Sequence, residues 1–485
     1  LSGQKEPFEP IHPGKVGIYL CGPTVYKPPH IGHMVGPIIF DAIKRYLQYK
    51  GYEVTWIVNV TDVDDKLIEA AASANSTVID LATKFTKQYF DCLTTLGVEG
   101  IDRFPKASEH MPEIIDICQK LIDSGYAYAT EGNVWFDVSK DSDYGKLSHR
   151  KVEEQESGTR SLEGSGKRNP ADFALWKKAK PGEPQWDSPW GPGRPGWHIE
   201  CSAMSMKYLG QSFDMHGGGM DLMFPHHENE LAQSESATGK PFAKYWMHNG
   251  LTRQNTKKMS GSLGNVVSAE NLLEDYGPQL VRYMLLSTQY RRPIEFNDEV
   301  MQGAKKGLSV FTRLFERIDR LAATVPGIAT EMDAASADLL PGEDEHFIRG
   351  ILTLKMKFLE MMDDDFNTAG AIGVMHEMAG EINSYIEQTK AEQEKSAHFV
   401  KIFSAAALSL KKLGLLLGLF REAPRPKAQG GSRALGDQLM ELIIQLREQA
   451  RKNKDFATAD AIRDGLAKLG ITVEDRPQGT IWRKE

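Results

Sequence analysis

Two histidines, His30 and His33, stand three residues apart where a loop rich in glycine and proline is followed by an amphipathic pattern. The first turn of a helix carries unpaired N–H groups and a partial positive charge, so it attracts anions. With Gly32 allowing close approach, these histidines suit a polyphosphate, to which they can donate hydrogen bonds as negative charge builds up. Helix capping or packing against a neighbour explains the two histidines equally well when they are taken alone.

A second candidate is the stretch KKMSGS, in which Lys257 and Lys258 are followed by Ser260 and Ser262. A lysine ammonium is a compact point charge that suits a triphosphate, and hydroxyl groups and backbone amides beside it suit the same ligand. Most lysine runs, however, lie on a solvated surface. This motif is therefore weak evidence by itself.

The surrounding pattern predicts the elements that would hold these residues. A strand over 16–20, a helix over about 32–50 and a strand over 54–60 form a βαβ opening. The acidic run that follows predicts another helix, with Thr61 or Asp62 as its N-cap.

Further along the chain the pattern changes twice. Residues 101–150 end in alternating apolar and polar positions with turn residues, which indicates a small β-rich insertion. Apolar residues at helical spacing then fill three segments, which predicts a helical bundle: 298–325, 344–390 and 395–421. A polar linker follows at 421–436, and the last segment predicts helices and then a short strand.

Length and composition restrict the class of protein. A chain of 485 residues is too long for a single core, since single cores stop growing near ~250 to 300 residues. Its 41% hydrophobic and 26% charged residues, without an apolar run of about 18 residues, favour a cytoplasmic protein. A net charge of -8 excludes a globally basic coat for nucleic acid but allows a local basic patch. The four cysteines lack the spacing of a disulfide framework, so we expect reduced thiols.

Together, HIGH at 30–33 and KMSGS at 258–262, on the two halves of a split nucleotide-binding pattern, resemble the class I aminoacyl-tRNA synthetases. Further motifs, in order over nearly the whole chain, resemble the cysteinyl-tRNA synthetase family: CGPTVY, NVTDVDDK, RNPADFALWK, GRPGWHIECSAM, HGGGMDLMFPHHENE and PQGTIWR. The resemblance implies a ligase that activates L-cysteine with ATP to cysteinyl-adenylate and pyrophosphate, and then transfers cysteine to the 3′-terminal adenosine of tRNA(Cys).

The family carries a zinc ion, and the resemblance places its ligands at Cys21, Cys201, His226 and Glu230. Pro225 suits the first turn of a helix, on which His226 and Glu230, four residues apart, share one face; adjacent His227 is the alternative. From spacing alone, two remote cysteines are more often buried small hydrophobic residues than zinc ligands. Zinc binds a thiolate far better than a hydroxyl, so it would select cysteine over serine without an editing domain.

The resemblance assigns roles to further residues. Those that line the cysteine pocket correspond to Gly22, Thr61, Trp197 and His216. The residues expected to bind ATP, which enters with Mg²⁺, are Gly32, Gly218, Asp221, Lys257, Lys258 and Ser260. His30, His33 and Lys258 are expected to stabilise the transition state. Without the resemblance, Trp197 is better explained as an ordinary core residue.

Two positions depart from the family's pattern. Gly261 replaces a lysine that supports the leaving pyrophosphate, and its loss would weaken transition-state stabilisation by up to ~3 kcal/mol if nothing compensates. We expect Lys257 and Lys258 to cover this role. Val35 occupies a position where arginine is common, and the sequence gives no account of it.

The expected fold is α/β: a split Rossmann-like (HUP-type) parallel-sheet catalytic domain with a connective insertion, then an α-helical anticodon-binding bundle and a small C-terminal α/β module. The expected boundaries are 1–115 and 197–260 for the two catalytic halves, 116–196 for the insertion, 261–325 for the lysine loop and stem-contact region, 326–421 for the bundle, 422–434 for a linker and 435–485 for the terminal module.

The resemblance also implies a monomer that binds tRNA(Cys), ATP and L-cysteine, and neither DNA nor a membrane. Three alternatives stay open. The cysteine ligase of mycothiol biosynthesis shares the zinc chemistry but typically lacks a long RNA-binding region at the C-terminus. A methionyl-tRNA synthetase shares HIGH and the lysine loop but does not explain the four zinc ligands. A non-catalytic tRNA-binding relative would carry Gly261 as its lesion, although such a protein need not keep both histidines.

Overall fold

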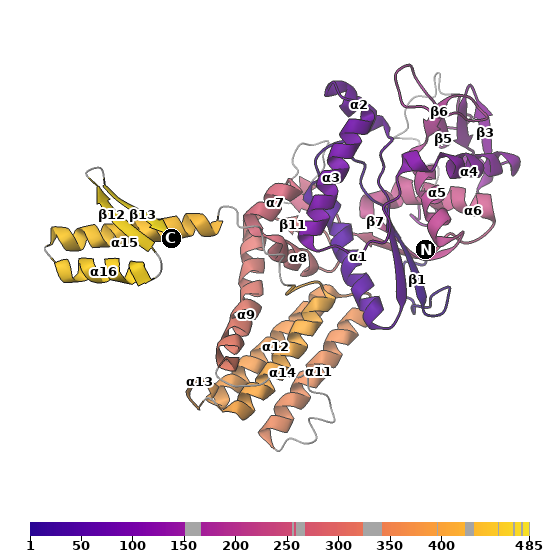
Figure 1. Ribbon diagram of the computed structural model, residues 1–485. Coiled ribbons are helices and arrows are strands. Elements are labelled where there is room, and N and C mark those ends of the chain that lie inside the picture. Colours follow the sequence, from indigo (N-terminus) through magenta and orange to yellow (C-terminus); the bar gives the residue numbers. More distant parts are fainter. Residues whose placement is uncertain are drawn as a thin grey trace. The chain divides into compact units, whose positions relative to one another are not determined.

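The computed structural model describes residues 1–150, 166–254, 257–258, 267–323, 342–394, 396–421, 431–453, 455–468, 471–476 and 479–484. These residues form two compact units, Leu1–Phe420 and Arg421–Glu485 (Figure 1). In the described part of the chain, no helix is long and apolar enough to cross a membrane.

The centre of the first unit is a parallel sheet of four strands in the order β2-β1-β7-β8. Its strands are β1 (Lys15–Leu20), β2 (Glu53–Val58), β7 (Phe213–Gly219) and β8 (Ala243–Asn249). The connections leave β1 in one direction and β7 in the other, so a crevice opens between the carboxyl ends of these two strands. The Cys21 amide donates to the Gly217 carbonyl (2.9 Å) across this point, which holds the two strand ends together.

Helices pack around the sheet in agreement with its buried, mostly apolar strands. They are α1 (Ile31–Tyr49), α2 (Asp65–Ser73), α3 (Val78–Leu96), α5 (Trp197–Leu209), α6 (Glu228–Thr238), α7 (Ala269–Tyr276) and α8 (Pro278–Leu286). Helix α1 is buried along most of its length and begins at the carboxyl end of β1. Its N-terminus therefore points into the crevice.

The chain between α3 and α5 builds a second, antiparallel sheet in the order β3-β4-β5-β6. It consists of β3 (Ala127–Thr130), β4 (Asn133–Phe136), β5 (Phe173–Lys178) and β6 (Gly193–Pro195), packed on α4 (Met111–Asp123). Asp65 at the start of α2 connects this helix to the antiparallel sheet, since it binds Lys177 on β5 (2.7 Å) and Arg194 on β6.

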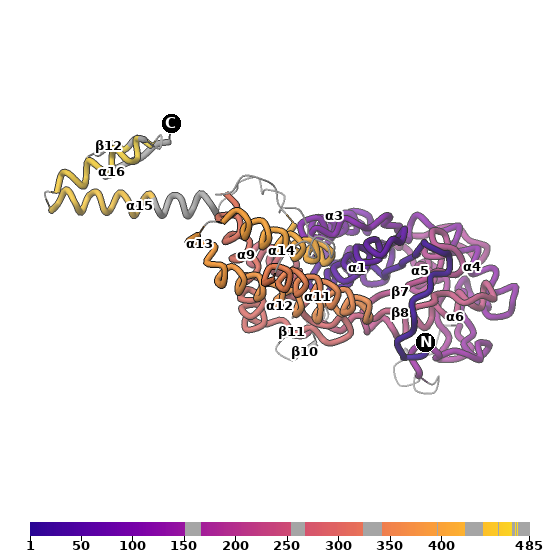
Figure 2. Tube along the Cα trace, turned by 90° about the horizontal axis from the view of Figure 1, so that it is seen from below, coloured from indigo at the N-terminus to yellow at the C-terminus, as the bar shows by residue number. Residues whose placement is uncertain are grey.

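Past β8, a small sheet joins β9 (Thr252–Gln254) to β10 (Lys257–Lys258) and β11 (Ile294–Phe296). The helical bundle follows, made of α9 (Asp298–Ala322), α11 (Glu343–Asp363), α12 (Thr368–Gln388), α13 (Ala391–Glu394) and α14 (Ala397–Leu416). Its long helices lie side by side in both views (Figures 1 and 2).

The bundle is attached to the far end of α1. The Tyr46 hydroxyl donates to Asp363 (2.7 Å) on α11, and Lys50 pairs with the same carboxylate (3.2 Å). Nearer the middle of α1, Asp41 forms an ion pair with Arg282 of α8, which is fully buried and also donates to the Leu417 carbonyl (2.7 Å). One helix thus carries the crevice at its start and the bundle at its end.

The second unit contains α15 (Gly431–Lys452), α16 (Phe456–Lys468) and an antiparallel pair, β12 (Ile471–Arg476) with β13 (Gly479–Lys484). The sequence predicted helices followed by one short strand here. The structure has both helices and a second strand, β13, that pairs with the first.

One local prediction was wrong. Helix α2 begins at Asp65 with Asp64 as its N-cap, because Thr61 is still held in extended backbone by a hydrogen bond to the Pro23 carbonyl (3.2 Å). Pro225 follows the non-helical residue Phe224 in a π-helix, Met223–His227, that continues into α6 at Glu228. The helical segment predicted over 344–390 contains two helices, since Asp365 and Phe366 both have positive φ between them.

Candidate active site and metal centre

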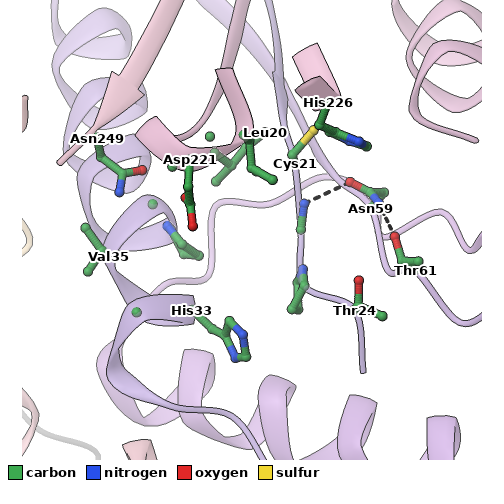
Figure 3. Close-up of a pocket in the computed structure, with 18 of the residues that line it drawn as sticks. Leu20, Cys21, Thr24, His33, Val35, Asn59, Thr61, Asp221, His226 and Asn249 are labelled. Atoms are coloured by element: carbon green, nitrogen blue, oxygen red, sulfur yellow. Dashed lines mark hydrogen bonds between the residues drawn. The ribbon is translucent and has the colours of Figure 1, made fainter. Parts of the chain in front are cut away.

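A pocket of about 300 Å³ opens at the carboxyl ends of β1 and β7. Most of the predicted site residues line it: Cys21, Gly22, His30, Gly32, His33, Thr61, Trp197, Cys201, Gly218, Asp221 and His226. In Figure 3, Cys21 and His226 lie at one end and His33, on the first turn of α1, at the other. The pocket therefore has a sulfur and imidazole end and a helix N-terminal end.

His30 and His33 form a reciprocal cap at the start of α1. The Gly32 amide donates to His30 Nδ1 (3.2 Å), and the His30 amide lies 3.4 Å from His33 Nδ1. The two rings stack with their centroids 3.8 Å apart. The sequence left open whether these histidines cap the helix or bind a ligand. In the structure they cap the helix and also line the pocket.

This capping fixes the hydrogen-bonding role of both rings. Since each Nδ1 accepts a backbone hydrogen bond, a neutral ring carries its proton on Nε2 and can donate it. Burial, and then the charge of Lys27, lower the pKa of His30 to about 4. Burial and the neighbouring charges of His30 and Lys27 also lower the pKa of His33 well below its usual value. Both rings are therefore neutral donors near pH 7.

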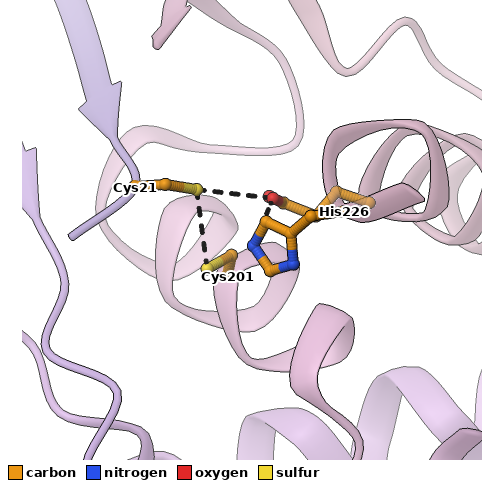
Figure 4. Close-up of side chains that lie close together, drawn as sticks. Cys21, Cys201 and His226 are labelled. Atoms are coloured by element: carbon orange, nitrogen blue, oxygen red, sulfur yellow. Dashed lines mark hydrogen bonds and ion pairs between the residues drawn. The ribbon is translucent and has the colours of Figure 1, made fainter. Parts of the chain in front are cut away.

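The other end of the pocket holds a compact cluster of metal-binding atoms from Cys21, Cys201, His226 and Glu230, all within 4.8 Å of one another. The two sulfurs are 3.8 Å apart, Cys21 Sγ is 3.5 Å from Glu230 Oε1, and His226 Nε2 is 3.0 Å from the same oxygen (Figure 4). Two thiolates at about 2.3 Å from a tetrahedral zinc ion would stand about 3.8 Å apart. The donor set and the spacing both fit zinc.

Three elements bring the cluster together. Cys21 follows β1, Cys201 lies on α5, and Glu230 lies on the first turn of α6, with His226 in the turn just before it. The expected pairing of His226 with Glu230 is present, although the two do not belong to one regular helix. The sequence separation of the ligands explains why spacing alone gave no signal.

The charges within the cluster support one another. Burial alone would raise the pKa of Glu230, but contacts with His216 and His226 hold it well below its usual value. Burial would lower the pKa of His226, yet the Glu230 carboxylate raises it to about 10. Burial would raise the pKa of Cys201, and the hydrogen bond with Cys21 is the main effect that brings it to about 6. Burial, and then the hydrogen bond with Cys201, raise the pKa of Cys21 well above its usual value. The cluster therefore favours the Cys201 thiolate and the Glu230 carboxylate, and a metal ion would have to displace the protons of Cys21 and His226.

A second combination of atoms, Cys21, His216, His227 and Glu230, is equally compact. Neither His216 nor His227 lines the pocket, however, whereas Cys21, Cys201 and His226 do. His216 was predicted to contact cysteine; it is fully buried and binds Glu230 through Nε2 (2.9 Å) instead. In this structure it contacts the Glu230 carboxylate of the candidate metal cluster and does not line the pocket.

The predicted cysteine-pocket residues other than His216 surround the cluster. The ring of Trp197 lies on that of His226, with centroids 4.2 Å apart. The side-chain Nδ2 of Asn59 donates to the Thr61 hydroxyl (3.2 Å), and its Oδ1 accepts from the Gly22 backbone N–H (2.8 Å; Figure 3). A Cβ on Gly22 would lie 1.7 Å from the Asn59 carbonyl oxygen, so only glycine fits there.

The predicted ATP residues divide into two groups. Gly32, Gly218 and Asp221 line the pocket. Gly32 contacts His30, and the charge of Asp221 acts on the same histidine. The backbones of Lys257 and Lys258 form β10, but their side chains, and Ser260 and Gly261 altogether, lie outside the described residues. Val35 is buried and lines the pocket.

Sequence reasoning missed several residues of this site. Asn59 follows β2 at the same edge as Cys21, so the position of a polar residue at a strand's carboxyl end was a usable signal. His198 places Nδ1 at 2.9 Å from His226 Nδ1, and its position next to Trp197 gave no sign of this. Thr24, Lys66 and Asn249 also line the pocket.

Comparison with known families agrees with this geometry. The model of the class I (C) tRNA synthetase catalytic domain matches residues 7–306, that of the DALR domain residues 357–421, and that of the cysteinyl-tRNA ligase anticodon binding domain residues 437–483. Cysteine–tRNA ligases of Syntrophotalea carbinolica and Thermococcus gammatolerans are 47% and 46% identical to this chain, over 100% of it and 98% of each relative.

Among solved structures, the Mycobacterium tuberculosis methionyl-tRNA synthetase in complex with methionyl-adenylate is similar with a TM-score of 0.60 and 17% identity, over 83% of this chain and 90% of that one. A leucyl-tRNA synthetase of Agrobacterium radiobacter K84, in a ternary complex, has a TM-score of 0.59 at 13% identity, over 85% and 86%. At these identities the likeness concerns the fold alone. The predicted fold class is confirmed.

Proposed function

Because the chain belongs to the cysteine–tRNA ligase family of class I synthetases, we propose that it activates L-cysteine with ATP and transfers it to the 3′-terminal adenosine of tRNA(Cys). The observation that supports this most is the single pocket with two chemically different ends. At one end, a cluster of sulfur, imidazole and carboxylate groups could hold a metal ion that binds a thiol. At the other end, neutral histidines at a helix N-terminus could donate hydrogen bonds to a phosphate.

In the first step, an oxygen of the cysteine carboxylate attacks the α-phosphorus of ATP while the bond to the pyrophosphate oxygen breaks. Negative charge increases on the transferring and leaving phosphates. We assign its stabilisation to the Nε2–H groups of His30 and His33, whose Nδ1 atoms accept backbone hydrogen bonds, and to the N-terminal amides of α1. In the second step, a terminal ribose hydroxyl attacks the adenylate carbonyl, and AMP leaves with the bonding electrons.

We propose that Cys21, Cys201, His226 and Glu230 hold zinc, which when bound accepts the substrate thiol as thiolate and so distinguishes cysteine from serine. His216 holds the second oxygen of Glu230 and keeps the carboxylate oriented toward the cluster. Trp197 closes the pocket over His226, and Gly22 and Thr61 form its floor with Asn59. Mg²⁺ enters with ATP as the nucleotide's counter-ion.

Lys257, Lys258 and Ser260 are proposed to bind the pyrophosphate part of ATP, and Gly32, Gly218 and Asp221 the rest of the nucleotide. The helical bundle and the second unit are proposed to hold the anticodon stem-loop, as the match of residues 437–483 to an anticodon binding domain suggests. The same match argues against an amino-sugar ligase. A monomeric state, a cytoplasmic location and the predicted domain boundaries stay predictions.

The test is charging of unfractionated tRNA by the purified protein with labelled cysteine and ATP, with serine and methionine as controls. We expect cysteine alone to be incorporated into acid-precipitable RNA. Adenylate formation without tRNA charging, together with transfer to an amino sugar, would favour the other ligase. Failure of both reactions in protein that contains stoichiometric zinc would contradict the proposed function.

A further inference from the structure

Lys27 has a buried ammonium group that the fold itself does not use. Its Nζ is screened from solvent and has no hydrogen-bond partner among the described residues. The ring of Tyr26 lies beneath it, with the centroid 5.1 Å from Nζ, but a ring face satisfies none of the three N–H donors. A buried charge without a partner is rare in folded proteins, so this one indicates a missing anion.

The position of Lys27 shows where that anion would be. The residue is followed by Pro28 and Pro29 and then by His30, the N-cap of α1. Two successive prolines restrict the backbone between the lysine and the helix. Lys27 lies just behind the pocket wall: Tyr26, the preceding residue, and His30, three residues further on, line the pocket. The charge of Lys27 acts on both His30 and His33.

This end of the pocket otherwise relies on neutral donors. His30 and His33 are uncharged near pH 7, and the amides of α1 carry only partial charge. Val35, one turn along the helix, is buried and apolar. Lys66 lines the pocket, but it is exposed, and its Nζ is 5.8 Å from the centroid of the Tyr26 ring. Lys27 therefore supplies a buried, fixed positive charge beside the two histidines.

We infer that Lys27 binds the pyrophosphate part of ATP from the helix N-terminal side and stabilises it as it leaves. This assignment deepens the proposed function and rests on it. It gives a binding role to one more residue of the same site. Lys27 precedes α1 near the start of the chain, whereas the lysine motif lies at 257–258. A lysine here acts as a point charge on the leaving group, so its effect belongs to adenylate formation and not to the transfer to tRNA.

The experiment compares Lys27→Gln and Lys27→Arg with the parent protein. Cysteine-dependent ATP–pyrophosphate exchange gives kcat and KM for ATP and for cysteine, and calorimetry gives the direct affinity for magnesium pyrophosphate and for AMP. We expect Lys27→Gln to weaken pyrophosphate binding about 10- to 100-fold and to lower kcat similarly, with AMP affinity and KM for cysteine unchanged. Lys27→Arg should recover most of both losses, since the charge is restored.

The matched control is Lys84→Gln, because Lys84 also lies over an aromatic ring, 5.6 Å from the centroid of Phe85, but is exposed and outside the pocket. It should leave every parameter unchanged. A Lys27→Gln protein that is less stable to heat but binds pyrophosphate like the parent would assign Lys27 a structural role with Tyr26 and overturn the inference. Calorimetry measures the effect of Lys27 on pyrophosphate affinity even if the parent protein shows no exchange with cysteine. Failure of the proposed function can therefore be distinguished from failure of the inference about Lys27.

Discussion

At the scale of single residues, the metal cluster depends on groups behind its ligands. His198 lies against His226, and their Nδ1 atoms are 2.9 Å apart. When His226 uses Nε2 toward the cluster, its Nδ1–H can donate to His198, whose pKa burial holds well below the usual value. Such outer contacts orient a metal-binding imidazole and fix its tautomer.

We therefore predict that His198→Ala lowers the affinity for zinc by about 10- to 100-fold. The measurement is competition with a chromophoric zinc chelator. His346→Ala is the control, since His346 is exposed on α11 and should leave the affinity unchanged. Equal zinc affinity in His198→Ala and the parent would contradict this role.

The lysine motif gives a second prediction at this scale. Gly261 removes one positive charge from it, and Lys258 is expected to carry the remaining function. We expect Lys258→Ala to lower kcat of ATP–pyrophosphate exchange about 100-fold, as loss of one charged donor to a leaving group does. Lys240→Ala, at an exposed position, serves as the control. Unchanged turnover in Lys258→Ala would show that the motif has lost its role.

The sequence revealed the site residues unequally. The proposed zinc ligands and the pocket glycines followed from motifs that resemble a family, whereas spacing alone could not join Cys21 to Cys201. They meet because β1 and α5 are brought together by the parallel sheet, which is a property of the whole fold. Lys27 was missed because nothing in its neighbourhood distinguishes it from a surface lysine before its burial is known.

At the scale of elements, Asp65 connects α2 to the antiparallel sheet β3-β4-β5-β6. Burial acts to raise its pKa, but hydrogen bonds and charges from Lys177 and Arg194 lower it to about 2. Asp65 caps no backbone group of α2, since that task falls to Asp64. Its contribution to stability therefore comes from ion pairs with β5 and β6.

We predict that Asp65→Asn lowers the free energy of unfolding by about 1–2 kcal/mol at pH 7, because the buried Arg194 loses one acidic partner and keeps Glu183, while the partial exposure of Asp65 limits the effect. A carboxylate with a lowered pKa stabilises the folded chain above its unfolded pKa of about 3.9 and loses this effect as the pH falls toward 2. The difference between variant and parent should thus be constant from about pH 7 to 5 and shrink below about pH 4. Urea unfolding followed by tryptophan fluorescence measures it.

The control is Asp91→Asn, which breaks an exposed pair with Lys87 within α3. It should change stability by no more than about 0.5 kcal/mol at any pH. A loss in Asp65→Asn that does not diminish in acid would mean that the amide is tolerated poorly for steric reasons and that the ion pairs contribute little.

Element positions were predicted well where local signals dominate and poorly where distant segments intervene. The opening strand and α1 lie within one residue of their predicted bounds. The start of α2 was placed too early because Val60 and Thr61 are held by backbone bonds to Pro105 and Pro23, contacts that no local pattern reveals. The split between α11 and α12 depends on two residues with positive φ, neither of them glycine.

At the scale of the whole molecule, the chain divides after Phe420 into two compact units, each with its own buried residues. The pocket and the metal cluster lie entirely in the first unit. We predict that a protein ending at Phe420 keeps cysteine-dependent ATP–pyrophosphate exchange but loses at least about 10-fold in kcat/KM for tRNA charging, since the removed unit is proposed to bind the anticodon stem-loop.

The measurement uses the same preparation for both reactions, so exchange serves as the internal control for folding. Charging that equals the parent's would show that the second unit is dispensable for tRNA. Loss of exchange as well would mean that the first unit needs the second for its own structure.

The attachment of α11 to α1 through Tyr46, Lys50 and Asp363 has a consequence for building chimeras. If the bundle were exchanged for that of another synthetase, the far end of α1 would lose its contacts with α11. If α8 were replaced too, Asp41 would also lose its ion-pair partner Arg282. An exchange of the bundle alone therefore removes the partners of the far end of α1. The workable crossover point is after Phe420, and a donor of new tRNA preference should be joined there.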